Sequence, residues 1–391
     1  MRIAVVHSFY SSRVPSGENQ VVLAQVAALR EAGHDVALVS RSTDDRLRRP
    51  TYPVEAALTT VTGVGPEPVE ELRAFRPDVV HVHNLFPNLG TRWLGRWRGA
   101  LVVTVHNFRP MCATGYLYRD GATCTACPDG DPWAGVRHGC FHGSRVATLP
   151  LAWRGRHGAA ADPLVRRADV LVTLSARARD VYVRAGVPED RLEVVPNFVA
   201  DSASVPVHRD PEKRFLCVGR LTPEKGVLDL VRSWPADVDL DIVGDGALAD
   251  DIRTVAPAGV RLLGSLDNTD LRDRMPGYAG LVIPSKWFEG LPTVYLEALA
   301  AGVPVICFPG NSAADDVATH GLGVVTGPSP DTDEVAQALL RVLAAGPPLR
   351  DRARASFTER FTAATWLRSI TAVYETAASS VTLPTSRPAS R

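Results

Sequence analysis

The stretch Pro284-Ser-Lys-Trp-Phe-Glu-Gly-Leu-Pro-Thr-Val-Tyr-Leu-Glu-Ala-Leu-Ala-Ala-Gly-Val-Pro-Val-Ile306 decides the fold. The apolar run 280–283 before it predicts a buried strand, and Pro292 suits the first residue of a helix. A second apolar run, 303–308, predicts the next strand. This strand-helix-strand succession is typical of a parallel α/β sheet, in which the corner between strand and helix faces a ligand crevice.

Two carboxylates of this stretch lie near that corner. Glu289 falls in the loop before the helix and Glu297 on the helix itself. The free N–H groups of residues 290–294 suit an oxygen-rich ligand, so the acidic pair beside them indicates a polyol partner. The alternative is that Glu289 caps the helix and Glu297 is a solvated helix residue.

Length and composition favour a globular protein with two domains over a nucleic-acid or membrane protein. A chain of 391 residues with 45% apolar and 22% charged residues can bury two cores. Its formal net charge is zero, which argues against a nucleic-acid binder. The apolar run at Met1–His7 is too short for a signal peptide, and no stretch has the length of a membrane span. We therefore expect a cytoplasmic protein, with peripheral membrane contact left open.

The N-terminal half begins as a Rossmann-like unit. Residues 3–6 predict a strand, 8–19 a polar loop and 20–32 a helix. Gly17, just before the helix, would let a phosphate approach the backbone, although a purely structural turn glycine fits equally. Two further strands, 78–83 and 100–106, each carry a histidine near the carboxyl end, where side chains reach the crevice. His81 and His83 alternate faces, so we expect at least one of them to be an ordinary packed residue.

Four cysteines follow His106 in a Gly- and Asp-rich segment that shows no obvious core. They are Cys112, Cys124, Cys127 and Cys140, and they follow the spacing C-x11-C-x2-C-x12-C. A central C-x2-C among four thiols predicts a structural zinc site that would order the loop. Free thiols and disulfides are the alternatives, and His138 and His142 are substitute ligands.

The second half opens with a candidate phosphate-binding loop. A strand ends at Gly219, and Arg220 and Lys225 flank the junction with the next helix, close enough to hold one diphosphate. Two solvated charges are the alternative. Gly244 opens a G-x-G-x-x-A turn after another strand, which is a weak dinucleotide fingerprint.

Glu289 and Glu297 form an E-x7-E pair, and residues 219–226 read G-R-x-x-x-x-K-G. Both patterns resemble those of the retaining glycosyltransferases of family 4, which have the GT-B fold. The resemblance implies that Glu289 and His106 contact the donor sugar, that Glu297 holds the ribose, and that Arg220 and Lys225 bind the diphosphate. It also implies that the donor is lined by Gly17, Gly219, Gly244, Gly290, Leu291, Pro292 and Thr293.

The resemblance implies two Rossmann-like domains facing across a cleft. We expect an acceptor domain at 1–200 with a Cys-rich insertion at 108–145, and a nucleotide-sugar domain at 201–360. A helix at 361–380 would cross back to the first domain, and 381–391 would form a disordered tail. The run 201–212 is the predicted linker.

The expected reaction is retaining sugar transfer from a nucleotide diphosphate sugar to a glycan, a lipid-linked sugar or a natural product. UDP is the commoner nucleotide of the family and GDP the alternative, and no catalytic metal is expected. Two rival functions are a non-catalytic nucleotide-sugar-binding protein and an NAD-dependent oxidoreductase that uses the Gly244 turn.

Overall fold

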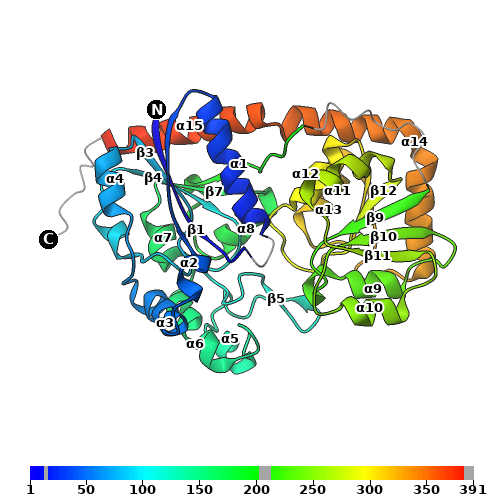
Figure 1. Cartoon of the computed structure of the whole chain (residues 1–391), viewed down its shortest axis with the longest axis horizontal. Coiled ribbons are helices and arrows are strands. Elements are labelled where there is room, and N and C mark those ends of the chain that lie inside the picture. Colours follow the sequence, from blue (N-terminus) through cyan, green and yellow to red (C-terminus); the bar gives the residue numbers. More distant parts are fainter. Residues whose placement is uncertain (13–15, 202–212, 383–391) are drawn as a thin grey trace. The chain divides into compact units, whose positions relative to one another are not determined.

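The computed structural model describes residues 1–12, 16–201 and 213–382. The chain forms two compact units, each built on a six-stranded parallel sheet (Figure 1). The first unit contains Met1–Gly115, Thr125–Val195 and the chain from Leu367 onward; the second contains Tyr116–Cys124 and Pro196–Trp366. Most of the predicted linker, and the tail from residue 383, lie outside the described residues. The prediction of two Rossmann-like α/β domains is confirmed.

The first sheet has the strand order β2-β1-β3-β4-β7-β8. Its chain connections run outward in opposite directions from the neighbours β1 and β3, which makes this junction a topological switch point. A ligand crevice is expected there, at the carboxyl ends of the strands. The strands are β1 (Arg2–Phe9), β2 (Asp35–Ser42), β3 (Val79–Asn84), β4 (Ala100–Val105), β7 (Val170–Thr173) and β8 (Leu192–Val194).

Serine side chains cap helices of this unit that directly follow strands. Ser16 accepts a hydrogen bond from the Asn19 N–H, so α1 begins at Gly17, earlier than predicted, and the Ser175 side chain caps α8 in the same way. The helices are α1 (Gly17–Glu31), α2 (Thr43–Leu47), α3 (Tyr52–Thr62), α4 (Val69–Phe75), α5 (Ala134–His138), α6 (Arg145–Gly155), α7 (Pro163–Arg167), α8 (Ala176–Arg184) and α15 (Ala363–Thr382), with short 3₁₀ turns at Arg92–Gly95, Ala159–Ala161 and Glu189–Arg191.

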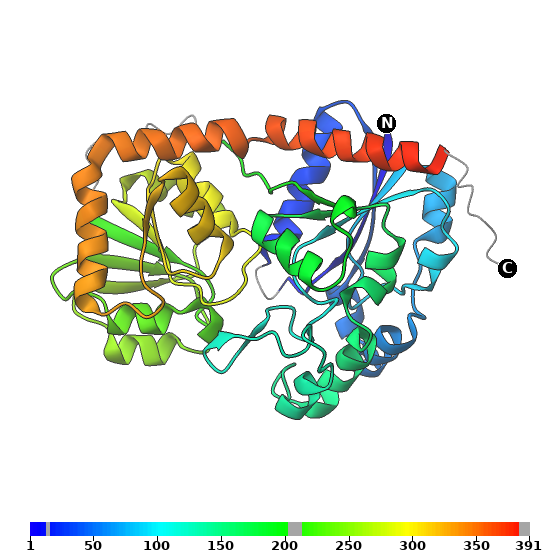
Figure 2. The same ribbon diagram turned by 180° about the vertical axis from the view of Figure 1, so that it is seen from behind.

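The C-terminal helix α15 belongs to this unit from Leu367 onward and lies alongside its sheet (Figure 2). Its buried Tyr374 hydroxyl is 2.8 Å from Nδ1 of His81 on β3. The α15 helix therefore contributes to the core of the same unit that contains β1 and β3.

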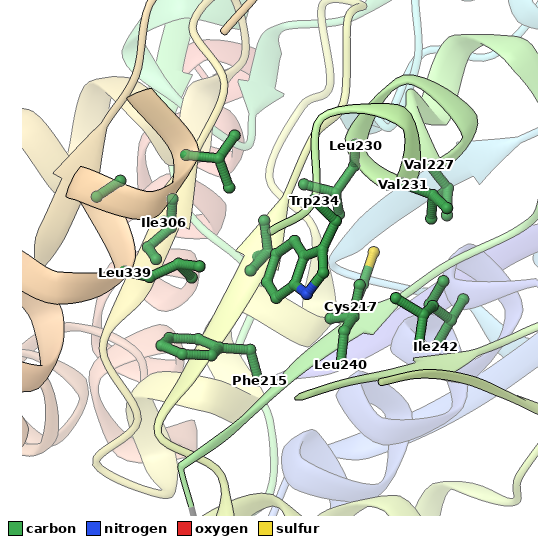
Figure 3. Packing of buried hydrophobic residues seen from close by; sticks show 14 of the residues in the cluster. Phe215, Cys217, Val227, Leu230, Val231, Trp234, Leu240, Ile242, Ile306 and Leu339 are labelled. Carbon is green, nitrogen blue, oxygen red and sulfur yellow. The ribbon is translucent and has the colours of Figure 1, made fainter. Parts of the chain in front are cut away.

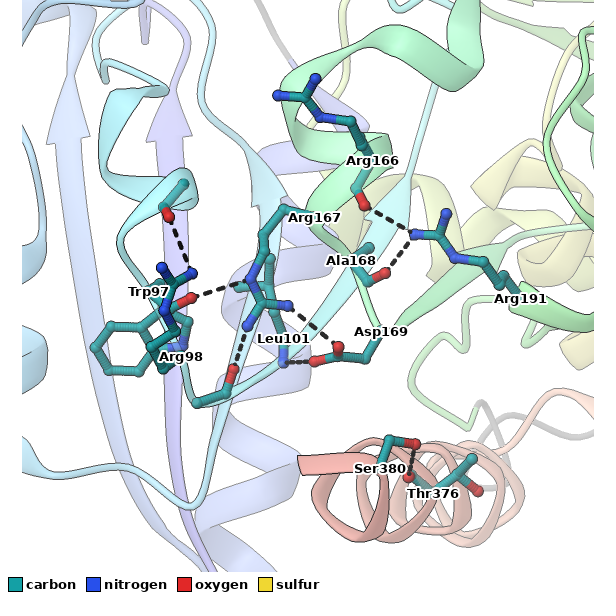
Figure 4. Close-up of polar contacts among 12 residues, drawn as sticks. Trp97, Arg98, Leu101, Arg166, Arg167, Ala168, Asp169, Arg191, Thr376 and Ser380 are labelled. Atoms are coloured by element: carbon teal, nitrogen blue, oxygen red, sulfur yellow. Dashed lines mark hydrogen bonds and ion pairs between the residues drawn. The ribbon is translucent and has the colours of Figure 1, made fainter. Parts of the chain in front are cut away.

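Arginine side chains bind backbone groups at the amino ends of strands in the first sheet, at the end of the sheet opposite the switch point (Figure 4). Arg167 donates to the backbone oxygens of Trp97 and Gly99 and pairs with Asp169, which in turn accepts from the Leu101 N–H. These bonds hold the starts of β4 and β7 in register, so the carboxyl ends of the same strands are fixed as well.

The second sheet has the order β11-β10-β9-β12-β13-β14, the strand order of a doubly wound dinucleotide-binding fold. Its switch point lies between β9 and β12. The strands are β9 (Arg214–Val218), β10 (Asp239–Val243), β11 (Val260–Gly264), β12 (Gly280–Ile283), β13 (Val305–Cys307) and β14 (Gly323–Val325), and a separate hairpin consists of β5 (Tyr118–Arg119) and β6 (Ala122–Thr123).

A buried apolar cluster holds the helices of the second unit against this sheet (Figure 3). From the sheet, Phe215 of β9 and Ile306 of β13 belong to this cluster. Leu230 of α9, Trp234 just after α9, and Leu339 of α14 also belong to it, and all five side chains are nearly inaccessible to solvent. Each such side chain contributes about 1.5–3 kcal/mol on burial. The helices are α9 (Val227–Arg232), α10 (Ala249–Val255), α11 (Asn268–Arg274), α12 (Thr293–Ala300), α13 (Ser312–His320) and α14 (Thr332–Arg360), with 3₁₀ turns at Pro223–Lys225 and Met275–Gly277.

One further helix boundary differs from the sequence prediction. Pro292 is the N-cap of α12 rather than its first residue, because its extended ψ of 134° lies outside the helical region. The long helix α14 consists of two helical stretches, because Gly346 at φ 54° and ψ −147° interrupts it. Within the described residues, no helix combines the length and the apolar character that a membrane span needs.

Candidate functional site

The switch point of the second sheet brings two loops together. Residues 219–226 follow β9 and residues 284–292 follow β12, and these two strands are parallel neighbours. The Lys286 N–H donates to the Glu224 carbonyl at 3.0 Å. At Gly226, φ is 69° and an added Cβ would lie 2.1 Å from the Pro284 oxygen, so only glycine lets the loops meet this closely.

An ion pair joins the two loops. Lys225 Nζ donates to Oε1 of Glu289, a residue only 8% exposed. The other carboxylate oxygen, Oε2, is buried and has no hydrogen-bond partner among the described residues. A buried carboxylate oxygen without a partner is costly, so this atom is available for a hydroxyl group of a ligand.

Arg220 lies on the same loop as Lys225. Its guanidinium donates to Glu224 Oε1 at 3.2 Å, while 40% of its side chain stays exposed. Glu289 also interacts electrostatically with Arg220. The structure thus brings together three of the four charged residues predicted for the site, Arg220, Lys225 and Glu289, and leaves one of them accessible to an anion.

Glu297 lies on α12, beyond the second loop. It is not a freely solvated helix residue, since burial raises the pKa of its carboxyl above the usual value, while the charge of Arg272 acts in the opposite direction. Hydrogen bonds from a ligand would therefore stabilise the ionised form of this carboxylate.

A close contact between two glycines and the uncapped N-terminus of α12 are further features of the loops at this switch point. An added Cβ at Gly244, where φ is 138°, would lie 2.0 Å from the Gly219 oxygen. Gly290 and the largely buried Leu291 precede the N-cap Pro292, which provides no side-chain cap for the helix that begins at Thr293. The first N–H groups of α12 can consequently serve a ligand.

Two aromatic residues that the sequence analysis missed stand beside the cations. The rings of Tyr116 and Trp287 are 4.9 Å apart, and Lys225 Nζ lies 5.4 Å from the Trp287 ring centroid. The dipeptide Asp120-Gly121 is typical of a tight hairpin turn. This signal could have shown from the sequence that the segment around Tyr116 forms an element distinct from the rest of the Cys-rich loop.

The switch point of the first sheet gathers histidines. His106 Nε2 is 2.9 Å from His83 Nδ1, while His81 is buried between the hydroxyls of Tyr374 and Thr104. Burial lowers the pKa of both His81 and His106 to about 3, so both rings are neutral. His81 is therefore a packed core residue, as expected for one of the two β3 histidines.

Gly17 is the first residue of α1 at this switch point, and its neighbour Glu18 was not predicted. The Glu18 Oε1 atom is buried without a partner among the described residues. Burial raises the pKa of Glu18 to about 7, against the opposing effects of Arg109 and Asn84. No sequence pattern singles out this carboxylate, because its burial arises from residues distant in the chain.

The predicted zinc site is not supported. In the described part of the chain, no three His, Cys, Asp or Glu side chains form a group that could hold a metal ion. Cys112 instead hydrogen-bonds with the Thr114 hydroxyl at 3.2 Å, and Cys124 belongs to the second unit whereas the other three cysteines belong to the first. The segment nevertheless contains buried apolar residues, Met111, Ala113 and Ala134, although no core was obvious from the sequence.

Comparison with known proteins identifies the family. Residues 15–202 match the family described as Glycosyltransferase Family 4, and residues 212–345 match Glycosyl transferases group 1. The solved structure of Anabaena HepE in complex with UDP and glucose superposes with a TM-score of 0.61 at 15% identity, over 96% of this chain and 99% of that one. The chain belongs with the family 4 glycosyltransferases of the GT-B fold.

Two curated relatives of this glycosyltransferase are named for different activities. A Corynebacterium glutamicum enzyme named as a GDP-mannose-dependent phosphatidylinositol monomannoside mannosyltransferase is 32% identical over 142 residues, which cover 32% of this chain but only 37% of the relative. The glycogen synthase of Mycobacterium tuberculosis is 27% identical over 91% of this chain and 89% of its own length.

Proposed function

We propose that this glycosyltransferase transfers a sugar, with retention of anomeric configuration, from a nucleoside diphosphate sugar held by its second unit. The observation that carries the proposal is the Lys225–Glu289 pair beside Arg220 at the switch point of the second sheet. A cation pair and a carboxylate with one unused oxygen match the two ends of such a donor, its diphosphate and its sugar hydroxyls.

In the proposed reaction the bond between the anomeric carbon and the diphosphate breaks, and the acceptor hydroxyl forms the new bond on the same face. The acceptor proton passes to the departing diphosphate. Arg220, Lys225 and the N-terminus of α12 stabilise the negative charge that develops on the leaving group, so no divalent metal is required. Glu289 orients the sugar, and Glu297 accepts hydrogen bonds from the ribose.

The proposed donor nucleotide is UDP, with GDP as the alternative. HepE was solved with UDP, whereas the mannosyltransferase relative is named for GDP-mannose. We further propose that the first unit receives the acceptor, a glycan, a lipid-linked sugar or a natural product, and that His106 and Gly17 keep the donor-binding roles that the family resemblance implies. A neutral His106 can contact a sugar without adding charge.

A panel of UDP- and GDP-sugars, tested by thermal shift and then by donor turnover, examines this proposal. For the donor that binds, Glu289→Gln and Lys225→Ala should lower turnover at least a hundredfold, because each removes one partner of the buried pair and its contact with the substrate. Asp250→Asn, at an exposed ion pair on α10, is the matched control and should keep wild-type turnover.

The outcomes separate catalysis from binding. A nucleotide sugar could stabilise the chain and yet be neither transferred to any acceptor tested nor slowly hydrolysed. That result would favour a non-catalytic binding protein. Near-normal turnover in both Glu289→Gln and Lys225→Ala would remove these residues from the mechanism.

A further inference from the structure

The hairpin Tyr116–Cys124 belongs to the second unit, although the chain on both sides of it belongs to the first. Asp120 and Gly121 both have positive φ, 52° and 83°, as a tight two-residue hairpin turn requires. The Cys124 N–H donates to the Leu117 oxygen at 2.7 Å and closes the hairpin at its base. It is therefore a defined element with its own hydrogen bonds.

The hairpin lies against the proposed diphosphate-binding loop. The Tyr118 hydroxyl donates to the Pro223 oxygen at 3.1 Å, two residues before Lys225. The Arg220 guanidinium carbon lies 5.6 Å from the Tyr116 ring centroid, and its Nη2 is 3.4 Å from the Tyr116 hydroxyl. Tyr116 thus contacts the one charged group of this loop that remains substantially exposed.

Two adjacent aromatic rings each have a cation beside them. The edge of one ring faces the other across the Tyr116–Trp287 pair at an interplanar angle of 70°, with Arg220 at the first ring and Lys225 at the second. The negative face of an aromatic ring attracts a cation, so each ring can hold one of two positive groups that would otherwise repel each other. Trp287 Nε1 is also buried, with no hydrogen-bond partner in the described part of the chain, and it is a donor that an anionic ligand can use.

We propose that Tyr116 is a positioning residue of the nucleotide-sugar site: backed by Trp287, its ring holds the Arg220 guanidinium ready for the diphosphate. This inference rests on the proposed function, since it requires an anionic donor at Arg220 and Lys225. It assigns a role in donor binding to a segment that the sequence places among the cysteines of the N-terminal half.

Calorimetric titration of the full chain with UDP, and with pyrophosphate as a second probe, tests the inference. Tyr116→Ala should weaken UDP binding about tenfold, because Arg220 loses the ring that holds it. Tyr116→Phe should stay within about threefold of wild type, since the hydroxyl contact is long and the ring is retained. Tyr118→Phe, which removes only the hydrogen bond to Pro223, is the control on the same hairpin and should also stay within about threefold.

A double-mutant cycle distinguishes positioning from a structural role. If Tyr116 acts through Arg220, Tyr116→Ala added to Arg220→Ala should weaken UDP binding no further. An additive loss in the double variant, equal losses in Tyr116→Phe and Tyr116→Ala, or wild-type affinity in Tyr116→Ala would overturn the inference and leave the proposed function intact. Failure of the wild-type chain to bind UDP, GDP or pyrophosphate would instead defeat the proposed function, and the inference with it.

Discussion

At the scale of single residues, the two sheet switch points use opposite electrostatics. In the second unit, charged groups face one another, as Lys225 and Glu289 do. In the first unit the ionisable side chains are held neutral by burial: four histidines, His7, His81, His83 and His106, have lowered pKa values. Stability of the first unit should therefore depend on pH in a way that the second unit does not share.

The first unit should lose stability as the pH falls below about 6.5. The folded-state pKa of His81 is about 3, below its unfolded value of 6.5, so its stabilising effect is present above pH 6.5 and is lost as the pH falls toward 3. Each such histidine can contribute up to about 1.4 kcal/mol per pH unit. Glu18, with its raised pKa of about 7, acts in the opposite direction but is a single group against four.

Hydrogen exchange of the β3 and β4 amides at pH 7 and pH 5, corrected for intrinsic rates, measures this effect. His81→Gln should show a shallower pH dependence than wild type, because one of the titrating groups is gone. Equal protection of wild-type β3 and β4 at both pH values would contradict the assignment of neutral, buried histidines.

At the scale of elements, a single glycine divides α14. Gly346 at φ 54° and ψ −147° ends one helix, and Pro347 begins the next, where its missing N–H needs no partner. Nothing lies within 4 Å of a Cβ added at Gly346, so a substitution there is opposed by backbone strain alone.

Gly346→Ala should destabilise the second unit by about 1–3 kcal/mol, the typical cost of a non-glycine residue in a sparsely allowed region. Exchange protection of the β9 and β12 amides reports the change. Gly277→Ala is the control, since Gly277 has open space around it and no left-handed φ; its effect should stay within about 0.5 kcal/mol. Equal effects of the two substitutions would mean that the backbone of Gly346 carries no strain.

At the scale of the whole molecule, each unit has its own sheet and core, so a donor bound to one should not stabilise both equally. Saturating UDP, at about 100 times its Kd, should add roughly 2.7 kcal/mol to the unit that binds it. The strongest gain in exchange protection should fall at residues 116–124, 219–226 and 284–294, and β2 should remain unchanged. A gain confined to the first unit would contradict a donor site in the second.

The sequence by itself determined the fold class, the two sheets and the chemistry of the candidate donor loops. Alternating strands and helices, Gly219 before Arg220, and the spacing of Glu289 and Glu297 are local patterns, and local patterns can be read along the chain. The family matches and the GT-B fold confirm the predicted family and fold class.

Only the tertiary structure decided which distant groups meet. The chain separates Lys225 from Glu289 by 64 positions and Tyr116 from Arg220 by 104. No local sequence pattern predicts either contact. The four cysteines show the converse, since a spacing typical of zinc ligands did not bring their side chains into a metal-binding group. Spacing along the chain fixes which residues can share a helix face or a turn, whereas burial and packing fix which loops lie against each other.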